Sequence, residues 1–214
     1  MFYKYRELEK GEFIIAGADT AAGGLDYSAC QFISKTKNDI PLVYHSKATS
    51  TVMTNDLYPI LNQIYDITGK KPVIAYERNF GGSFELERLN TLNREGKYTI
   101  FKEMGKIGTG DMEAGEKLGW TTTAASRLKM LEDLKNCLDN AVLRIYNERT
   151  VSELYNFIVK QTANGWKAQA ERNAHDDLVM SLAIAFQVYQ YAKEPTSEGV
   201  NPNTNWTQTI SPDW

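Results

Sequence analysis

Four acidic side chains stand at the ends of segments whose composition is typical of buried elements. Asp19 directly follows the apolar run FIIAGA, and Glu77 directly follows the apolar run PVIAY. Asp176 and Asp177 stand at the start of the last, mostly apolar helical segment. A carboxylate in such a place is costly to desolvate unless a cation pairs with it. If the two strand ends and the helix start meet at one edge of a sheet, the acids form a cluster that divalent cations stabilise.

The chemistry of such a cluster is specific. Ligand sets made of oxygen alone favour Mg²⁺ or Mn²⁺ over zinc. Two such ions about 4 Å apart are the device for in-line phosphodiester cleavage, in which one ion activates water and the other stabilises the leaving oxygen. The sequence therefore predicts that Asp19, Glu77, Asp176 and Asp177 are the metal ligands and catalytic residues of a two-metal site.

Each acid also has a purely structural interpretation. Asp19 precedes the turn-rich segment AAGG, where Asp is common, and Glu77 is followed by an arginine that could pair with it. If Asn173 caps the last helix, Asp176 is its third residue and completes a capping box. Asp177 has the weakest structural role. We therefore expect Asp177 to be the metal ligand, with Asp176 as its supporting or alternative partner.

The elements that would position these acids alternate along the chain. Apolar runs predict strands, apolar residues at helical spacing predict helices, and Asn164-Gly165 is a type I′ turn signal within a hairpin. The first three strands are expected to form an antiparallel meander. The predicted fold class is α/β, a mixed central sheet flanked by helices. Strands are expected at 13–18, 28–34, 41–45, 72–76, 98–101 and 142–145, and helices at 55–68, 84–95, 123–140, 151–157 and 174–191. A hairpin is expected at 158–169 and a long Gly-rich loop at 104–120.

Length and composition indicate one domain with a tail. The chain has 214 residues, a hydrophobic fraction of 42% and a formal net charge of −3. We expect a domain over 1–194 and a flexible C-terminal tail over 195–214, which is rich in Pro, Asn, Thr and Ser. The charge excludes a strongly basic protein that holds nucleic acid by bulk charge, although a locally basic groove is compatible with it.

Several protein classes are excluded by absent features. The two cysteines, Cys30 and Cys137, are too few and too far apart for a disulfide framework or a CxxC metal site, which suits a reducing cytoplasm. No apolar run reaches the roughly 18 residues that a membrane span needs, and the N-terminus lacks the apolar stretch of a signal peptide. We therefore expect an intracellular-type chain with no membrane partner.

Three segments around the acids resemble a known family. FIIAGADTAAGGLDYSA, VIAYERNFGG and NAHDDLVMSLAIAF resemble the acidic motifs of the nuclease domain of bacteriophage large terminase subunits, and the resemblance runs over about 13–191. It implies an RNase H-like fold with a β-hairpin before the last helix and a site for two Mg²⁺ or Mn²⁺ ions. It also implies an endonuclease that cuts concatemeric double-stranded viral DNA during genome packaging, in the host cell cytoplasm.

Carried over by residue, Asp19 matches the first-strand acid of the family, Glu77 the second acid, and Asp176 with Asp177 the terminal pair. The family implies a terminase ATPase domain, a portal and a small terminase subunit as partners. The sequence contains no GxxxxGK[ST] phosphate loop, so no part of it is a motor. We interpret the chain as a nuclease domain excised from a longer protein.

Other basic and histidine residues have open roles. We expect Lys160, Lys167 and Arg172, in and after the predicted hairpin, to help guide DNA. His175 beside the acid pair either contacts a phosphate or carboxylate, or is a surface or capping residue. The mixed charges of the segment 123–140 are typical of a solvated helix face.

Two other functions remain open at this point. One is a structure-selective nuclease that resembles the Holliday-junction resolvases of the same superfamily. The other is an inactive module that docks on a portal or capsid.

Overall fold

The apolar run that ends at Asp19 forms an inner strand of the central sheet. The computed structural model describes residues 1–21, 26–79, 81–104, 116–162, 165–170 and 175–194, with the backbone alone at 104, 116, 158–162 and 165–170. The central sheet has six strands in the order β1-β4-β3-β2-β5-β6. The strands are β1 (Phe2–Lys4), β2 (Ile14–Asp19), β3 (Ser28–Ser34), β4 (Asp39–Ser46), β5 (Val73–Tyr76) and β6 (Thr99–Ile100).

The sheet is mixed, as the sequence predicted. Strands β2, β3 and β4 pair antiparallel through short connections, which confirms the meander. Strand β5 pairs parallel with β2, and β6 pairs parallel with β5. Parallel neighbours end at the same edge of the sheet, so the residues that follow β2 and β5 are brought together.

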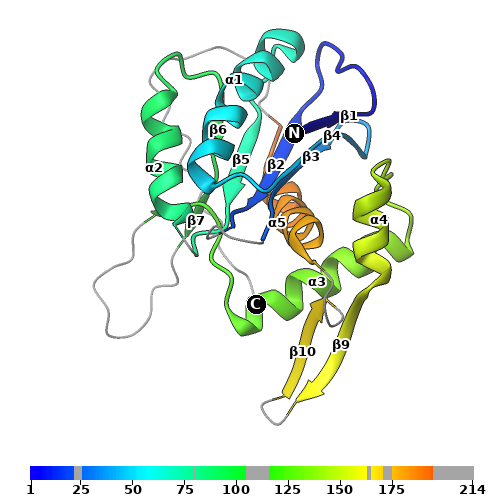
Figure 1. Ribbon diagram of the computed structural model, residues 1–214. Helices are drawn as coiled ribbons and strands as arrows, with labels where there is room; N and C mark the ends of the chain where they lie inside the picture. Colours follow the sequence, from blue (N-terminus) through cyan, green and yellow to red (C-terminus); the bar gives the residue numbers. More distant parts are fainter. Residues whose placement is uncertain (22–25, 80, 105–115, 163–164, 171–174, 195–214) are drawn as a thin grey trace.

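Helices cover both faces of this sheet (Figure 1). Helices α1 and α2 lie on one face, and α5 lies across the other face, where α3 and α4 pack outside it. The five helices are α1 (Ser50–Thr68), α2 (Gly82–Leu92), α3 (Ala124–Asp139), α4 (Glu148–Tyr155) and α5 (Asp177–Tyr191).

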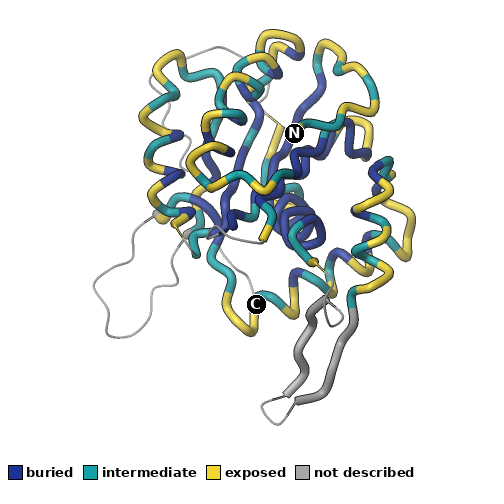
Figure 2. Tube along the Cα trace, in the orientation of Figure 1, coloured by how far each residue is buried: buried dark blue, intermediate teal, exposed yellow. Residues whose placement is uncertain are grey.

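The alternation of side chains along β2 builds two cores. Ile15 packs with α3 and α5, whereas its neighbour Ile14 packs with α1 and α2. Helix α5 is buried almost throughout, which confirms the prediction that a helix apolar on nearly every side lies on the sheet beneath a further layer (Figure 2). It approaches β2 so closely that a Cβ on Gly17 would lie 2.2 Å from the backbone nitrogen of Ala185. Only glycine permits this packing.

Two small antiparallel pairs complete the described structure. Strands β9 (Phe157–Thr162) and β10 (Gly165–Ala170) form the predicted hairpin, which projects from the body beside α3 (Figure 1). Strands β7 (Lys102–Met104) and β8 (Glu116–Leu118) also pair. The prediction of one continuous loop over 104–120 is therefore wrong at 116–118, and residues 105–115 lie outside the described part. The predicted tail, 195–214, lies outside it as well.

Three further predictions need correction. The segment 142–145 is not a strand, because only Arg144 bridges to Asp39 after the backbone turns at Ala141 with a φ of 53°. Strand β1 was not predicted; it is a three-residue edge strand on β4. Helices α1 and α4 begin earlier than predicted because Thr49 and Asn147 cap them with side-chain hydrogen bonds.

The architecture carries no sign of a membrane-spanning element: within the described residues, every helix is too short or too polar to cross a bilayer.

Candidate metal centre

The backbone places Asp19 and Glu77 at one edge of the sheet. Ala18 and Tyr76 are register partners in the parallel pair of β2 and β5, and the two acids are the residues that follow them. The Glu77 N–H donates to the Ala18 carbonyl over 2.9 Å, which extends the pairing by one step. The expected meeting of the two strand ends is thus a consequence of parallel register.

The chain around Glu77 is held on both sides. The Trp120 N–H donates to the Tyr76 carbonyl over 2.9 Å, and the Arg78 N–H donates to the Trp120 carbonyl over 2.9 Å. A Cβ on Gly82 would lie 1.8 Å from the Glu77 carbonyl oxygen, so the start of α2 sits directly on this residue. Glu77 therefore leaves the sheet along a fixed path.

The Asp19 carboxyl group lies close to that of Glu77. Burial raises the pKa of Asp19 well above its ordinary value, and the charges of Glu77 and Asp177 raise it further. The Asn79 amide also donates to Glu77 Oε1 over 3.1 Å. Burial and the neighbouring negative charges therefore favour the protonated form of Asp19.

The start of α5 brings the second acidic pair to the same place. Asp176 is the N-cap of α5 and Asp177 its first residue, and both charges act on Asp19. Asp176 makes no side-chain capping bond. The predicted capping box, with Asn173 as cap and Asp176 at the third position, is therefore wrong, because the helix begins three residues later than expected.

Asp177 is the acid with a free oxygen. Its side chain is 15% exposed, and Oδ2 accepts no hydrogen bond from any described residue. Burial, together with the charge of Asp176, raises the pKa of Asp177 to about 6. His175 Nδ1 lies 3.7 Å from the same Oδ2, beyond hydrogen-bond distance.

Asp176 is held differently. Arg127 of α3 donates from Nη2 to Asp176 Oδ2 over 2.7 Å, and both side chains are about a third exposed. The sequence predicted that the mixed charges of 123–140 lie on a solvated helix face. This is correct for Lys129, which pairs with Asp133 along α3, and wrong for Arg127, which pairs with Asp176. The ion pair joins positions 49 residues apart, and no local sequence pattern indicates it.

Glu153 is a further acid that the sequence did not single out. Its Oε2 accepts from the Leu178 N–H over 2.9 Å, next to Asp177. Burial raises the pKa of Glu153 to about 7, with an added contribution from the charge of Asp177. It lies in an amphipathic helix, where an isolated acid is usually solvated, so its sequence gave no signal of this position.

The fit to a metal ion rests on two features of these acids. Within the described residues, no three His, Cys, Asp or Glu side chains already surround a single metal position. Even so, burial and the charge of Glu77 raise the pKa of Asp19, and Asp177 Oδ2 has no hydrogen-bond partner among the described residues. A divalent cation would relieve the repulsion between these acids and satisfy the free oxygen, so the donor set fits such an ion.

The predicted DNA-contacting residues lie on the hairpin or beyond it. Lys160 of β9 and Lys167 of β10 occupy directly opposed positions in the ladder. Arg172 lies outside the described residues.

Comparison of the structure with solved structures identifies nuclease domains of the same fold. The large terminase nuclease of the thermophilic phage G20c, with bound magnesium, superposes with a TM-score of 0.59 at 19% identity, over 86% of this chain and 84% of the other. The large terminase nuclease domain of Thermus phage P74-26 gives 0.60 at 18% identity, over 88% and 84%. The manganese-soaked terminase nuclease domain of human cytomegalovirus gives 0.53 at 12% identity, over 84% of each chain.

Sequence comparison adds nothing to this result, since no protein-family model and no curated protein matches the chain. The structural likeness spans nearly the whole described body and confirms the predicted RNase H-like architecture. The chain has the fold of a terminase nuclease domain.

Proposed function

We propose that this chain is a metal-dependent endonuclease domain of a phage DNA-packaging terminase, which cuts concatemeric double-stranded DNA with two Mg²⁺ or Mn²⁺ ions. One observation supports the proposal most directly: the parallel pair of β2 and β5 sets Glu77 beside Asp19, and the charge of Asp177 acts on Asp19 as well. These acids lie in a fold shared with terminase nucleases that were solved with magnesium and manganese.

The acids have distinct roles in this proposal. Asp19 and Glu77 hold the ions from the strand ends, and Asp177 contributes its unpartnered oxygen from the helix. Asp176 is the supporting partner, because Arg127 already neutralises it. Asn79 keeps Glu77 oriented. When bound, the ions supply an activated water and stabilise the leaving oxygen. No side chain need act as a nucleophile.

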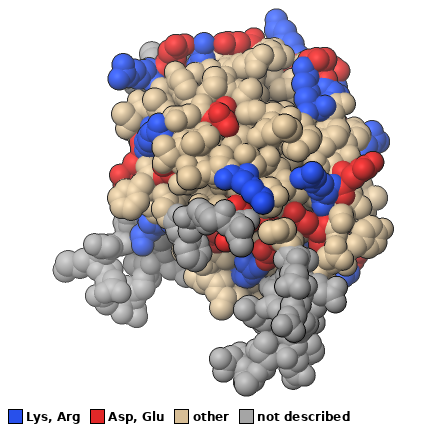
Figure 3. Space-filling view, viewed as in Figure 1, with Lys and Arg blue, Asp and Glu red and all other residues tan. Residues whose placement is uncertain are grey.

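The surface charge favours weak binding of DNA by this domain alone. Basic and acidic side chains are interspersed over the face in Figure 3, where acidic side chains in the lower centre have basic ones beside them. With a net charge of −3, binding is expected to fall steeply as salt rises. Lys160 and Lys167 on the hairpin help to guide the duplex. The rest of the affinity for DNA would come from an ATPase domain, a portal and a small terminase subunit in the host cytoplasm.

Plasmid cleavage with Mn²⁺ or Mg²⁺ tests this function. Asp19→Asn keeps the shape of the side chain and removes a ligand charge, so cutting should fall by at least about 100-fold. Asp139→Asn is the matched control, because Asp139 is exposed and, among the described residues, pairs with Lys135 along α3. Equal cutting by the wild type and Asp19→Asn would refute the site.

Two outcomes would redirect the assignment. Preference for a four-way junction over a linear duplex would identify a structure-selective resolvase. Absence of Mn²⁺ binding by calorimetry in the folded protein would identify a docking module.

A further inference from the structure

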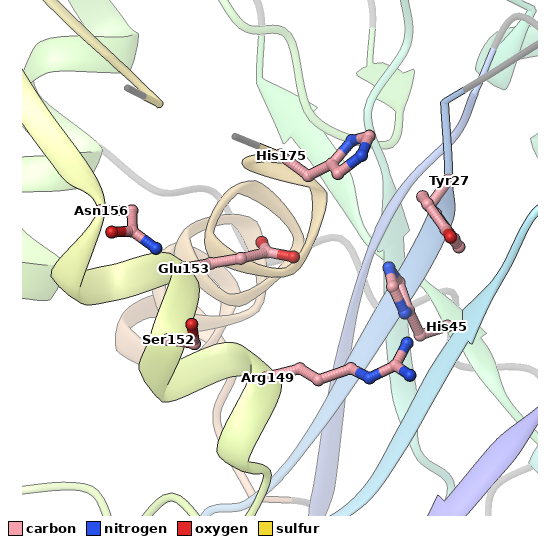
Figure 4. Close-up of a pocket in the computed structure, with 7 residues that line it drawn as sticks. All are labelled: Tyr27, His45, Arg149, Ser152, Glu153, Asn156 and His175. Atoms are coloured by element: carbon pink, nitrogen blue, oxygen red, sulfur yellow. The ribbon is translucent and has the colours of Figure 1, made fainter. Parts of the chain in front are cut away.

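A second hollow adjoins the acidic cluster. It is a pocket of about 360 Å³ between the exposed side of α4 and the end of the sheet (Figure 4). His175 lines it, and the same side chain lies 3.7 Å from Asp177. The pocket therefore opens next to the proposed metal ligands without containing them.

One wall of the pocket is a polar face of α4. Arg149, Ser152, Glu153 and Asn156 all line it, and their spacing of three, four and seven residues places them on one side of the helix. The guanidinium, hydroxyl and amide groups are hydrogen-bond donors. Leu154 lies on another side of the helix and packs against the core. This wall therefore presents several donors to whatever occupies the pocket.

The facing wall holds a buried, unpartnered imidazole. His45 of β4 is 7% exposed, and neither ring nitrogen has a hydrogen-bond partner among the described residues. Burial and the nearby Arg149 charge lower the pKa of His45 to about 4, so the ring is neutral and offers one donor and one acceptor. A buried polar atom without a partner keeps the full cost of its lost hydration. The ring points into the pocket (Figure 4), where a ligand would supply the missing partner.

Charge and stacking define the class of ligand. Arg149 is exposed, makes no ion pair with any acid in the described part of the chain, and extends toward His45 (Figure 4). Tyr27 stacks on His45 with ring centroids 4.4 Å apart, and Lys47 lies over the Tyr27 ring at 5.2 Å. His45 and Lys47 already contact the Tyr27 ring, which leaves less aromatic surface for a base. The Arg149 guanidinium, together with the Ser152 and Asn156 donors, instead suits a phosphate oxyanion.

The acid in this wall does not oppose such a ligand strongly. Glu153 Oε2 accepts a backbone hydrogen bond from the Leu178 N–H over 2.9 Å, so one of its oxygens is already satisfied by the protein. We propose that the pocket formed by Arg149, Ser152, Asn156, His45 and Tyr27 binds a backbone phosphate of the DNA strand next to the phosphate that is cut. This inference rests on the proposed nuclease function and adds a substrate subsite to it.

Binding measured without metal tests the subsite separately from cutting. A short labelled DNA duplex is titrated in EDTA at several salt concentrations, and binding is followed by fluorescence anisotropy. Arg149→Ala should raise Kd about tenfold and lower the slope of log Kd against log salt by about 1, the signature of one lost phosphate contact. Arg94→Ala, an exposed arginine after α2, is the matched control and should change Kd less than about twofold.

A second variant separates the pocket from bulk charge. His45→Phe keeps the stack on Tyr27 and removes the ring nitrogens, so Kd should rise about fivefold with an unchanged salt slope. Arg149→Ala changes an exposed helix residue and should leave the melting temperature unaltered, so it remains informative if His45→Phe fails to fold. Duplexes with and without 5′-phosphates should bind equally; binding that needs the terminal phosphate would overturn the assignment to a backbone phosphate.

The failures of the two proposals are distinguishable. If Arg149→Ala and Arg94→Ala bind alike while cutting still depends on Asp19, the subsite is wrong and the nuclease stands. If Arg149→Ala weakens binding but no cutting occurs with either metal, the proposed function is wrong. The pocket would then contact DNA phosphate without an adjacent cut, which overturns its role as a substrate subsite.

Discussion

Glu77 lies beside Asp19 because its backbone N–H donates to the carbonyl of Ala18 over 2.9 Å. The parallel ladder of β2 and β5 thereby continues one residue past the strands and fixes two carboxyl groups side by side. Burial and the charge of Glu77 raise the pKa of Asp19, since two ionised carboxylates repel each other. Without a metal ion the protonated form of Asp19 is thus favoured, and binding of a cation would displace its proton.

Metal-free protein should lose stability as pH rises from about 6.5 to about 8. The pKa of Glu153 is raised to about 7 and that of Asp19 well above its ordinary value, so the folded state binds more protons than the unfolded state over this range. The free energy of unfolding should fall by about 1 kcal/mol. The depressed pKa of His45, about 4, acts in the opposite direction only below about pH 6.5.

Melting temperatures measured across this pH range check the prediction. Mn²⁺ should restore the stability lost at high pH, because it replaces the departing protons. Glu153→Gln, which can still accept from Leu178, should flatten the curve. A melting temperature that rises with pH in the metal-free wild type would contradict the proposed electrostatics.

Replacing Arg127 should slow cutting without weakening metal binding. In Arg127→Gln, Asp176 loses the ion pair that holds it, so the turnover rate should fall about tenfold. The cluster also becomes more negative, so the Mn²⁺ concentration for half-maximal cutting should not increase. Lys129→Gln on the same helix is the control, since its exposed pair with Asp133 contributes little. A loss confined to metal affinity would argue against a positioning role for Arg127.

Removing both hairpin lysines should weaken DNA binding and spare the metal centre. Lys160→Ala with Lys167→Ala should raise Kd by about tenfold or more and reduce the salt slope by up to about 2. Calorimetric Mn²⁺ affinity should stay unchanged. Lys10→Ala with Lys71→Ala removes equal charge before β2 and β5, at the opposite ends of those strands, and should have little effect. An equal loss of DNA affinity in the two double variants would show that the hairpin lysines act only through the overall charge of the domain.

Adding a methyl group at position 17 should destabilise the whole domain. In Gly17→Ala, the new carbon meets backbone atoms of α5, at 2.2 Å from the Ala185 nitrogen, and backbone cannot turn aside as a side chain can. We expect a loss of at least about 3 kcal/mol, seen as a lower midpoint of urea unfolding. A loss below about 1 kcal/mol would show that α5 does not pack as tightly on β2 as described.

Local sequence was sufficient where one element determines its own structure. The apolar runs ending at Asp19 and Glu77 predicted their strands within one residue, because buried strands need continuous apolar sequence. Edge strand β1 escaped prediction, since a segment of only three residues forms a strand only when β4 offers its edge. The apolar segment 142–145 failed for the opposite reason: it has strand-like residues but only one pairing position.

The sequence by itself determined which residues can carry charge chemistry and the elements whose ends present them, because hydrophobic periodicity and terminal acids are local properties. Only the tertiary structure decided how those charges are balanced. Arg127 reaches Asp176 across 49 residues, and Glu153 reaches the Leu178 N–H across 25. His45 and Arg149 face each other from β4 and α4 across one pocket. Such pairings depend on how the helices pack on the sheet, which no local pattern specifies.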